Sequence, residues 1–390
     1  MKKALAFLMA AVMLMSMLTA CGNKDNAADN NDNNDVSTAE ADQAAADKVA
    51  ALIDAIYVQE RTEETDAQCE AAKAAWDALT DAQKALVEGE EASPDYFGLD
   101  TGDASKDDPR NQDEIGEKEL LVVSFGTSFN DSRVADIKSI EDALQEANPD
   151  WSVRRAFTAQ IIINHIQARD GEKIDNMEQA LERAIANGVK QLVVQPTHLM
   201  HGAEYDEMCA AIDKVRDQFD SVEIAEPMLG EVGNDATVIN ADKEAVAKAV
   251  VAAALEESGY ETTAAAKDAG VAYVLMGHGT AHVAKVTYSQ MATQMEKLGY
   301  ENVFVGTVEG EPEDTSCEAV IAAVKEAGYT TVVLRPLMVV AGDHADRRSG
   351  SSMFEAAGLT VNCQISGLGR IADVQALYVA HTKAAIDAIA

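Results

Sequence analysis

VVQPTHLMHGAEY (residues 193–205) and VLRPLMVVAGDHA (333–345) have the same sequence pattern, and this repetition is the main evidence for the fold. Each begins as an apolar run, reaches a proline, and continues through a loop to a glycine at the same spacing. A shorter pair, VVSFGTS (122–128) and VLMGHGTA (274–281), matches about its Gly-Thr dipeptide. Because both pairs occur in the same order along the chain, the sequence predicts two similar halves.

We place these halves at 118–235 and 236–390, and each one alternates apolar runs with amphipathic segments. Short apolar runs separated by helical patterns are typical of parallel sheets with helices on both faces. The sequence therefore predicts an α/β fold in which two sheets face each other across a cleft. The expected strands are 120–125, 152–157, 191–196, 221–226, 271–276, 302–308, 331–336 and 360–365, and the expected helices are 133–147, 176–187, 204–218, 241–257, 284–298 and 314–326.

The N-terminus has the pattern of a secretory signal. Two lysines precede an apolar stretch that is too short to span a bilayer, and LTAC (18–21) ends it. This ending resembles a bacterial lipobox, in which Cys21 becomes the lipidated first residue of the mature chain. We therefore expect a signal peptide at 1–20 and an extracytoplasmic protein that is anchored to the membrane by lipid.

Three further segments precede the first half. Residues 21–45 are rich in Asn, Asp and Ala, which predicts a disordered tether. Residues 46–88 have helical periodicity, with Thr80 and Gln83 as a capping box, and resemble a small helical module of Gram-positive surface proteins. A spacer, a contact module and a simple helical stalk all fit that pattern. Residues 89–117 are acidic, contain Pro and Gly, and are expected to be a linker.

Charge and cysteine content limit the function. The formal net charge of −36 excludes nucleic-acid binding, which needs a basic surface. The cysteines beyond the signal are widely spaced and form no metal-binding motif, so one disulfide, buried thiols or free thiols are all compatible with the sequence. They are Cys69, Cys209, Cys317 and Cys363.

Three polar residues follow strands of the second half. His278 comes directly after one strand, Glu309 after the next, and His344 after a third. The carboxyl ends of parallel strands meet at one edge of a sheet, where ligands bind. Two imidazoles and a carboxylate suit a divalent first-row metal ion and leave coordination positions open. The alternative is that these residues only satisfy loop backbone. The chain has no P-loop, GxSxG or HExxH motif, and nothing in it calls for ATP.

Six ordered motifs resemble the anaerobic cobalt chelatase family of the CbiK type, over roughly residues 118–390. That family inserts Co²⁺ into sirohydrochlorin, a tetrapyrrole, without ATP on the anaerobic route to cobalamin. The motifs are SFGTSFNDSR (124–133), RRAFTAQIIINHI (154–166), VVQPTHLMHGAEY, MGHGTAH (276–282), TVEG (307–310) and PLMVVAGDHA (336–345).

The resemblance implies the class II chelatase fold, with two flavodoxin-like halves around an active-site cleft. It assigns the metal to His278, Glu309 and His344, and we expect His278 also to accept pyrrole protons as a neutral imidazole. The same ligand set accepts Fe²⁺ and Ni²⁺ as well as Co²⁺. We expect substrate contacts from His198, Glu204, His282 and Arg154, where His282 lines the pocket or caps the following helix.

The chain also departs from the family pattern. Where the family has an acidic loop with a tryptophan, this chain has DRRSGSSMFEAAG (346–358), and His201 stands where proline is usual. His201 is either a further ligand or a solvent-exposed loop residue. A polycarboxylate substrate needs local positive charge on so acidic a protein. The candidates for it are Arg133, Arg154, Arg155, Arg335, Arg347 and Arg348.

Two functions are carried forward from the sequence. The first is a sirohydrochlorin cobaltochelatase, and the second is an extracytoplasmic lipoprotein that binds haem, another tetrapyrrole or a metal without turnover. A weaker third reading is a surface adhesion module that acts through residues 46–88. The sequence leaves a homo-oligomer open.

Overall fold

The computed structural model describes residues 31–341 and 350–389, and it contains the two predicted sheets. Each sheet has four parallel strands, in the orders β2-β1-β3-β4 and β6-β5-β7-β8. This is the flavodoxin-like order, so the predicted α/β class with two similar halves is confirmed. The strands are β1 Lys118–Ser124, β2 Ser152–Phe157, β3 Gln191–Pro196, β4 Ser221–Ile224, β5 Val271–Gly277, β6 Val303–Thr307, β7 Thr331–Pro336 and β8 Thr360–Cys363.

Helices cover both faces of each sheet, which is why the central strands are apolar without alternation. In the first half the helices are α4 Asn130–Ser132, the π-helical turn η2 Arg133–Lys138, α5 Ser139–Ala147, α6 Gln160–Asp170, α7 Met177–Ala186, α8 Ala203–Asp213 and η3 Arg216–Gln218. The second half has α9 Ala241–Ser258, α10 Thr263–Asp268, η4 Val283–Lys285, α11 Val286–Lys297, η5 Glu313–Thr315, α12 Cys317–Glu326, α14 Ser351–Ala356, η6 Leu368–Arg370 and α15 Ala372–Ile389.

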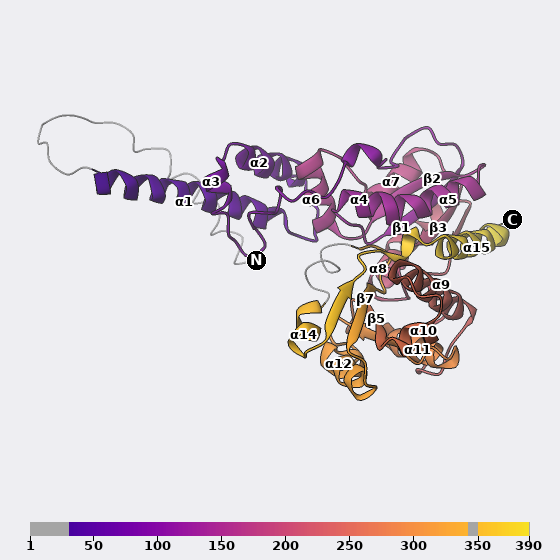
Figure 1. The fold of residues 1–390 in the computed structure, drawn as a ribbon. Helices are drawn as coiled ribbons and strands as arrows, with labels where there is room; N and C mark the ends of the chain where they lie inside the picture. The colour runs from indigo at the N-terminus through magenta and orange to yellow at the C-terminus, as the bar shows by residue number, and fades with distance from the viewer. Residues whose placement is uncertain (1–30, 342–349, 390) are drawn as a thin grey trace, which may run out of the picture.

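The last helix, α15, returns to the first half (Figure 1). Its Tyr378 hydroxyl donates to the Thr197 carbonyl at 2.7 Å, and the Thr382 hydroxyl donates to Gln195 Oε1 at 2.8 Å. Both partners lie at or just after the end of β3. The sheets therefore follow the predicted division of the chain, whereas the C-terminal helix packs on the half that precedes it in sequence.

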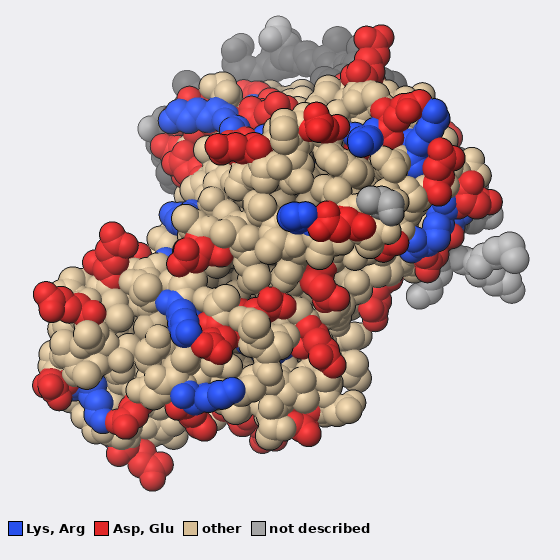
Figure 2. Space-filling view, turned by 90° about the vertical axis from the view of Figure 1, so that its right-hand side faces the viewer, with Lys and Arg blue, Asp and Glu red and all other residues tan. Residues whose placement is uncertain are grey.

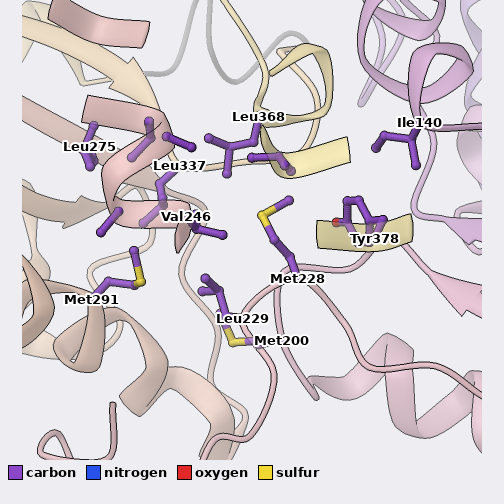
Figure 3. Packing of buried hydrophobic residues seen from close by; sticks show 14 of the residues in the cluster. Ile140, Met200, Met228, Leu229, Val246, Leu275, Met291, Leu337, Leu368 and Tyr378 are labelled. Atoms are coloured by element: carbon purple, nitrogen blue, oxygen red, sulfur yellow. The ribbon is translucent and has the colours of Figure 1, made fainter. Parts of the chain in front are cut away.

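A single apolar cluster joins the halves (Figure 3). Met228 and Leu229 come from the segment that follows β4, and they lie between Tyr378 of α15 and residues of the second half. Leu275 of β5 and Met291 of α11 belong to the same cluster and are fully buried. Burial of such side chains contributes about 1.5–3 kcal/mol each, so the cluster holds the two halves in one arrangement.

The helical segment at the N-terminus packs against the first half. It contains α1 Asn31–Ile56, α2 Thr65–Asp77 and α3 Asp81–Lys84, which begins with the predicted capping box of Thr80 and Gln83. Its contacts are with α6, where Asn164 donates to the Ile56 carbonyl at 2.8 Å. The His165 ring stacks on Tyr96, with 4.2 Å between the ring centroids. The tether prediction for 21–45 is wrong from residue 31 onward, because α1 begins there.

The segment predicted as a linker is also anchored. The Asp107 carboxylate accepts from Arg133 Nε at 2.6 Å and from Arg155 Nη1 at 2.7 Å, and all three side chains are fully buried. Glu141 of α5 binds the other edge of Arg155. A short 3₁₀ turn, η1 (Ala104–Lys106), leads the chain into this network. Residues 89–117 therefore form part of the first half rather than a free connection.

Among the described residues, no helix has the length and apolar character needed to cross a bilayer. The predicted signal peptide and Cys21 lie outside the described residues.

Candidate metal and tetrapyrrole site

His278 and Glu309 lie side by side at the carboxyl ends of neighbouring strands. β5 and β6 pair in register up to Gly277 and Thr307, and the Glu309 amide then donates to the His278 carbonyl at 2.9 Å. This bond brings His278 Nδ1 within 3.3 Å of Glu309 Oε1. The two side chains are 45% and 50% exposed, so an ion arriving from solvent can reach both.

Two glycines make this approach possible. Gly279 has a φ of +95°, and a Cβ at that position would lie 3.0 Å from the Glu309 Cβ. A Cβ on Gly277 would collide with the Tyr288 ring. The Tyr288 hydroxyl accepts from the Gly279 amide at 3.2 Å, which fixes the loop that carries His278. As predicted, His278 comes directly after a strand, since β5 ends at Gly277 and the chain turns there into a loop.

The third predicted ligand, His344, lies outside the described residues. Its strand β7 is the neighbour of β5, and the Leu337 amide donates to the Met276 carbonyl at 2.7 Å. Residues 31–341 and 350–389 contain no group of three His, Cys, Asp or Glu side chains that could hold a metal ion. His278 and Glu309 therefore form a pair within the described residues, and the role of His344 stays a prediction.

The first half brings His198 and Glu204 to the same junction. Both ring nitrogens of His198 are buried and lack a hydrogen-bond partner among the described residues. Burial lowers the pKa of His198 to about 4, against the opposing charge of Glu204. Burial also raises the pKa of the Tyr288 hydroxyl, and the negative charges of Glu309 and Glu204 raise it further. The charge of Glu204, in the first half, therefore acts on Tyr288 in the second half.

His282 has the capping role that the sequence predicted as one alternative. Its Nδ1 accepts from the Ala284 amide at 3.2 Å at the start of η4, and its Nε2 lies 3.3 Å from Asp206 of α8. His201 Nε2 lies 3.0 Å from Glu226 Oε2, which gives this loop histidine an acidic partner. Both halves contribute to an open pocket of about 670 Å³ here, lined in part by His201, Glu226, Val232, Val283 and Val286.

The predicted substrate contact of Arg154 is not supported by its location. Arg154 is fully buried in β2, where it donates to the Arg110 carbonyl and pairs with Asp175 at 3.3 Å. Arg133 and Arg155 are equally buried in the network around Asp107, and Arg335 is 3% exposed. All four guanidinium groups are buried and already paired with carboxylates of the chain, so none of the four is available to an incoming polycarboxylate. Arg347 and Arg348 lie outside the described residues.

Tyr288 and Asp206 were not found from the sequence, although each contacts a predicted site residue or its loop. Tyr288 stands in the first turn of the helix after GHGTAH, and an aromatic residue at that place beside two glycines is the signal that could have identified it. Asp206 lies on an exposed turn of α8, where an acidic residue carries no distinguishing signal. Tyr288 holds the loop backbone, and Asp206 connects the two halves.

The sequence profile of the cobalt chelatase (CbiK) family matches residues 118–387 of the chain. The chain belongs to this family. It is 31% identical over 278 residues to a sirohydrochlorin cobaltochelatase of Salmonella typhimurium, covering 70% of this chain and 97% of that protein. It is 26% identical over 290 residues to the sirohydrochlorin cobaltochelatase CbiKC of Nitratidesulfovibrio vulgaris, covering 72% and 95%.

A similar solved structure is that of SirB from Bacillus subtilis with Fe³⁺. It has a TM-score of 0.47 and 15% identity, and the similarity covers 70% of this chain and 98% of SirB. The family match begins at the first residue of β1 and includes His278, Glu309 and His344. The helical segment and the anchored linker precede the matched region, so they are additions of this CbiK-family chain to the chelatase halves.

Proposed function

We propose that this chain is a sirohydrochlorin cobaltochelatase that inserts Co²⁺ into its tetrapyrrole without ATP. Membership of the cobalt chelatase family supports the reaction, and the two curated relatives are named for this substrate. The observation that carries the proposal is the His278–Glu309 pair, held 3.3 Å apart at two adjacent strand ends and half exposed. Such a pair can receive an ion and also release it, as a chelatase must.

Metal insertion replaces two pyrrole N–H bonds by bonds from nitrogen to the ion, so two protons must leave for each Co²⁺ that enters. A neutral imidazole is suited to accept such protons near pH 7. We assign one of these protons to His278, which loses its hold on the ion as it takes the proton, and the other leaves to the solvent that reaches this half-exposed pair. Glu309 balances the positive charge of the ion and of the protonated imidazole. His344 would complete the set, and Fe²⁺ or Ni²⁺ would fit the same donors.

The test is cobalt insertion by the full chain, followed by the change in sirohydrochlorin absorbance. We expect the parent to accelerate insertion and His278→Ala to lower the rate by about 100-fold or more, since positioned proton transfer contributes about 10²–10⁴-fold. His381→Gln is the matched control, because His381 lies on α15 and binds Glu226 and Asp242 instead. A parent that binds the tetrapyrrole tightly without acceleration would be a binding protein, and His278→Ala at parental rate would refute the site.

We also propose that the mature chain is anchored outside the cytoplasm through lipid on Cys21. The support is the sequence pattern of residues 1–21. At 1.5 Å per residue, the 26-residue α1 spans about 39 Å, enough to separate the chelatase halves from a lipid surface. Mass spectrometry of the mature N-terminus tests this, with Cys21→Ser as the variant that should lose the lipid. Self-association of the anchored chain is tested by light scattering.

The exposed charge fits this setting. Figure 2 shows carboxylates spread over both lobes of one face, with basic groups scattered among them. A surface of this kind attracts divalent cations and repels acidic lipid headgroups, so the separation provided by α1 is consistent with the charge of the chain. ATP has no place in the proposal, since the chain carries no phosphate-binding motif.

A further inference from the structure

The two halves repeat the same backbone bonds at their strand ends. In the second half the Glu309 amide donates to the His278 carbonyl at 2.9 Å. In the first half the Ala159 amide donates to the Phe125 carbonyl at 3.2 Å, at the same point of the fold. The glycine that follows has a φ of +95° in one half and +101° in the other. Phe125 therefore occupies the position of His278, and Ala159 that of Glu309.

The side chains at these equivalent positions differ in chemistry. Phe125 and Ala159 have no atom that can bind a metal ion, so the paired ligands belong to the second half alone. Phe125 is nevertheless 44% exposed, although the last six residues of β1, which come directly before it, are all buried. A large aromatic ring that a strand end holds partly in solvent has apolar surface left to cover.

The segments that follow β1 and β5 both contact the opposite half. The helical turns α4 and η2, which follow β1, reach the loop after β7, where the Ser132 hydroxyl donates to the Ala341 carbonyl and the Ala341 amide donates to Asp136 Oδ2 at 3.1 Å. In the opposite direction, the loop after β5 reaches α8 through the pair of His282 and Asp206. The segments that follow Phe125 and His278 thus each contact the opposite half of the chain.

We propose that Phe125 is a substrate-contacting residue whose ring packs against the face of the tetrapyrrole while His278 holds the ion. The inference rests on the proposed function, and it assigns different tasks to the two halves. A conjugated macrocycle offers a flat apolar face, and aromatic side chains stack on such faces. A ring without donor atoms does not compete for the ion, so Co²⁺ collects on one half only. Duplication of the fold thus supplies a metal side and a macrocycle side.

The experiment measures three quantities on the full chain: the Kd for metal-free sirohydrochlorin by fluorescence, the Kd for Co²⁺ by calorimetry, and kcat and KM for insertion. The variants are Phe125→Ala and Phe125→Trp. Leu86→Ala is the matched control, because Leu86 is an exposed apolar residue (39%) of the N-terminal helical segment. Circular dichroism verifies that each variant is folded, and an exposed side chain such as Phe125 is not expected to be needed for that.

We expect Phe125→Ala to raise the sirohydrochlorin Kd and the KM about tenfold, which corresponds to about 1.4 kcal/mol, with the Co²⁺ Kd unchanged. Phe125→Trp should retain binding, and Leu86→Ala should match the parent. Unchanged sirohydrochlorin affinity in Phe125→Ala, with a parent that binds and metallates, would overturn this inference and leave the proposed function intact. Loss of Co²⁺ affinity in that variant would also overturn it, because Phe125 would then act through the fold. A parent that does not bind sirohydrochlorin would overturn both.

Discussion

The buried carboxylate of Asp107 offers the sharpest test of how the N-terminal additions are held. It accepts hydrogen bonds from Arg133 Nε at 2.6 Å and from Arg155 Nη1 and Nη2 at 2.7 and 2.9 Å. None of the three side chains is exposed. Asp107→Asn keeps the shape of the side chain, removes its charge, and turns an NH₂ group toward cationic donors. We therefore expect the first half to lose stability.

The magnitude follows from the charges that remain. Glu141 still binds Arg155, but Arg133 keeps only Asn130, the Thr127 carbonyl and a longer contact with Glu172. Burial alone would raise the pKa of Asp107, yet bonds and charges of Arg155 and Arg133 outweigh it and lower the pKa to about 2 from 3.8. That difference is worth about 2 kcal/mol, fully present above pH 3.8 and lost as the pH falls from 3.8 through 2. Breaking a buried pair costs about 3–5 kcal/mol, so we expect a loss of about 3 kcal/mol.

The assay is urea and thermal unfolding at pH 7, followed by circular dichroism. A loss of about 3 kcal/mol should lower Tm by about 4 °C in a chain of 390 residues, at an unfolding entropy of about 2.1 cal/mol/K per residue. Asp113→Asn is the matched control, because Asp113 belongs to the same segment and also binds an arginine, Arg183, but its side chain is 64% exposed. Exposed pairs are worth about 0–1 kcal/mol. Equal stability of the two variants would refute the reasoning, because a buried ion pair would then contribute no more to the free energy of unfolding than an exposed one.

Three further predictions concern other parts of the chain. Burial lowers the pKa of His165 to about 4, so as the pH falls the unfolded chain takes up a proton on this residue before the folded chain does. The free energy of unfolding should therefore fall by about 2–3 kcal/mol from pH 7 to 4.5 through His165. In urea unfolding, His165→Gln should lack this contribution of about 2–3 kcal/mol to the pH dependence. Gly279→Ala should weaken Co²⁺ binding in calorimetry by displacing Glu309, whereas Gly259→Ala, with an equally left-handed φ but open space, should not. Tyr378→Phe should cost about 1–2 kcal/mol in thermal unfolding, because it leaves a buried carbonyl unpaired.

The strands were predictable because burial on both faces makes them continuous apolar runs. All eight expected strands occur, with ends within two residues of those predicted. The sequence places His165 and His381 on helices but gives no bounds for the helices that contain them, α6 and α15. Their apolar residues pack against elements that are distant in sequence: α6 packs on the N-terminal helical segment, and α15 packs on the first half. A periodicity measured within one segment does not identify such partners.

The candidate site was predictable to the extent that strand ends define it. The juxtaposition of His278 and Glu309 follows from parallel strands that end at one edge, and the structure places them 3.3 Å apart. Arg154 could not be judged in the same way, because its sequence neighbourhood gives its charge but not its carboxylate partner. Asp175 lies 21 positions downstream, and only the folded chain brings the two together.

The anchored linker changes what the N-terminal additions can do. The helical segment is held on α6 by Asn164, and the linker is held separately by the stack of Tyr96 on His165 and by Asp107. Two separate attachments prevent rotation about either one, so α1 keeps a fixed direction relative to the strand ends that carry His278 and Glu309. A fragment that began at residue 118 would lose Asp107 and leave two buried arginines without it, so we expect it to be less stable than a fragment that begins at residue 100.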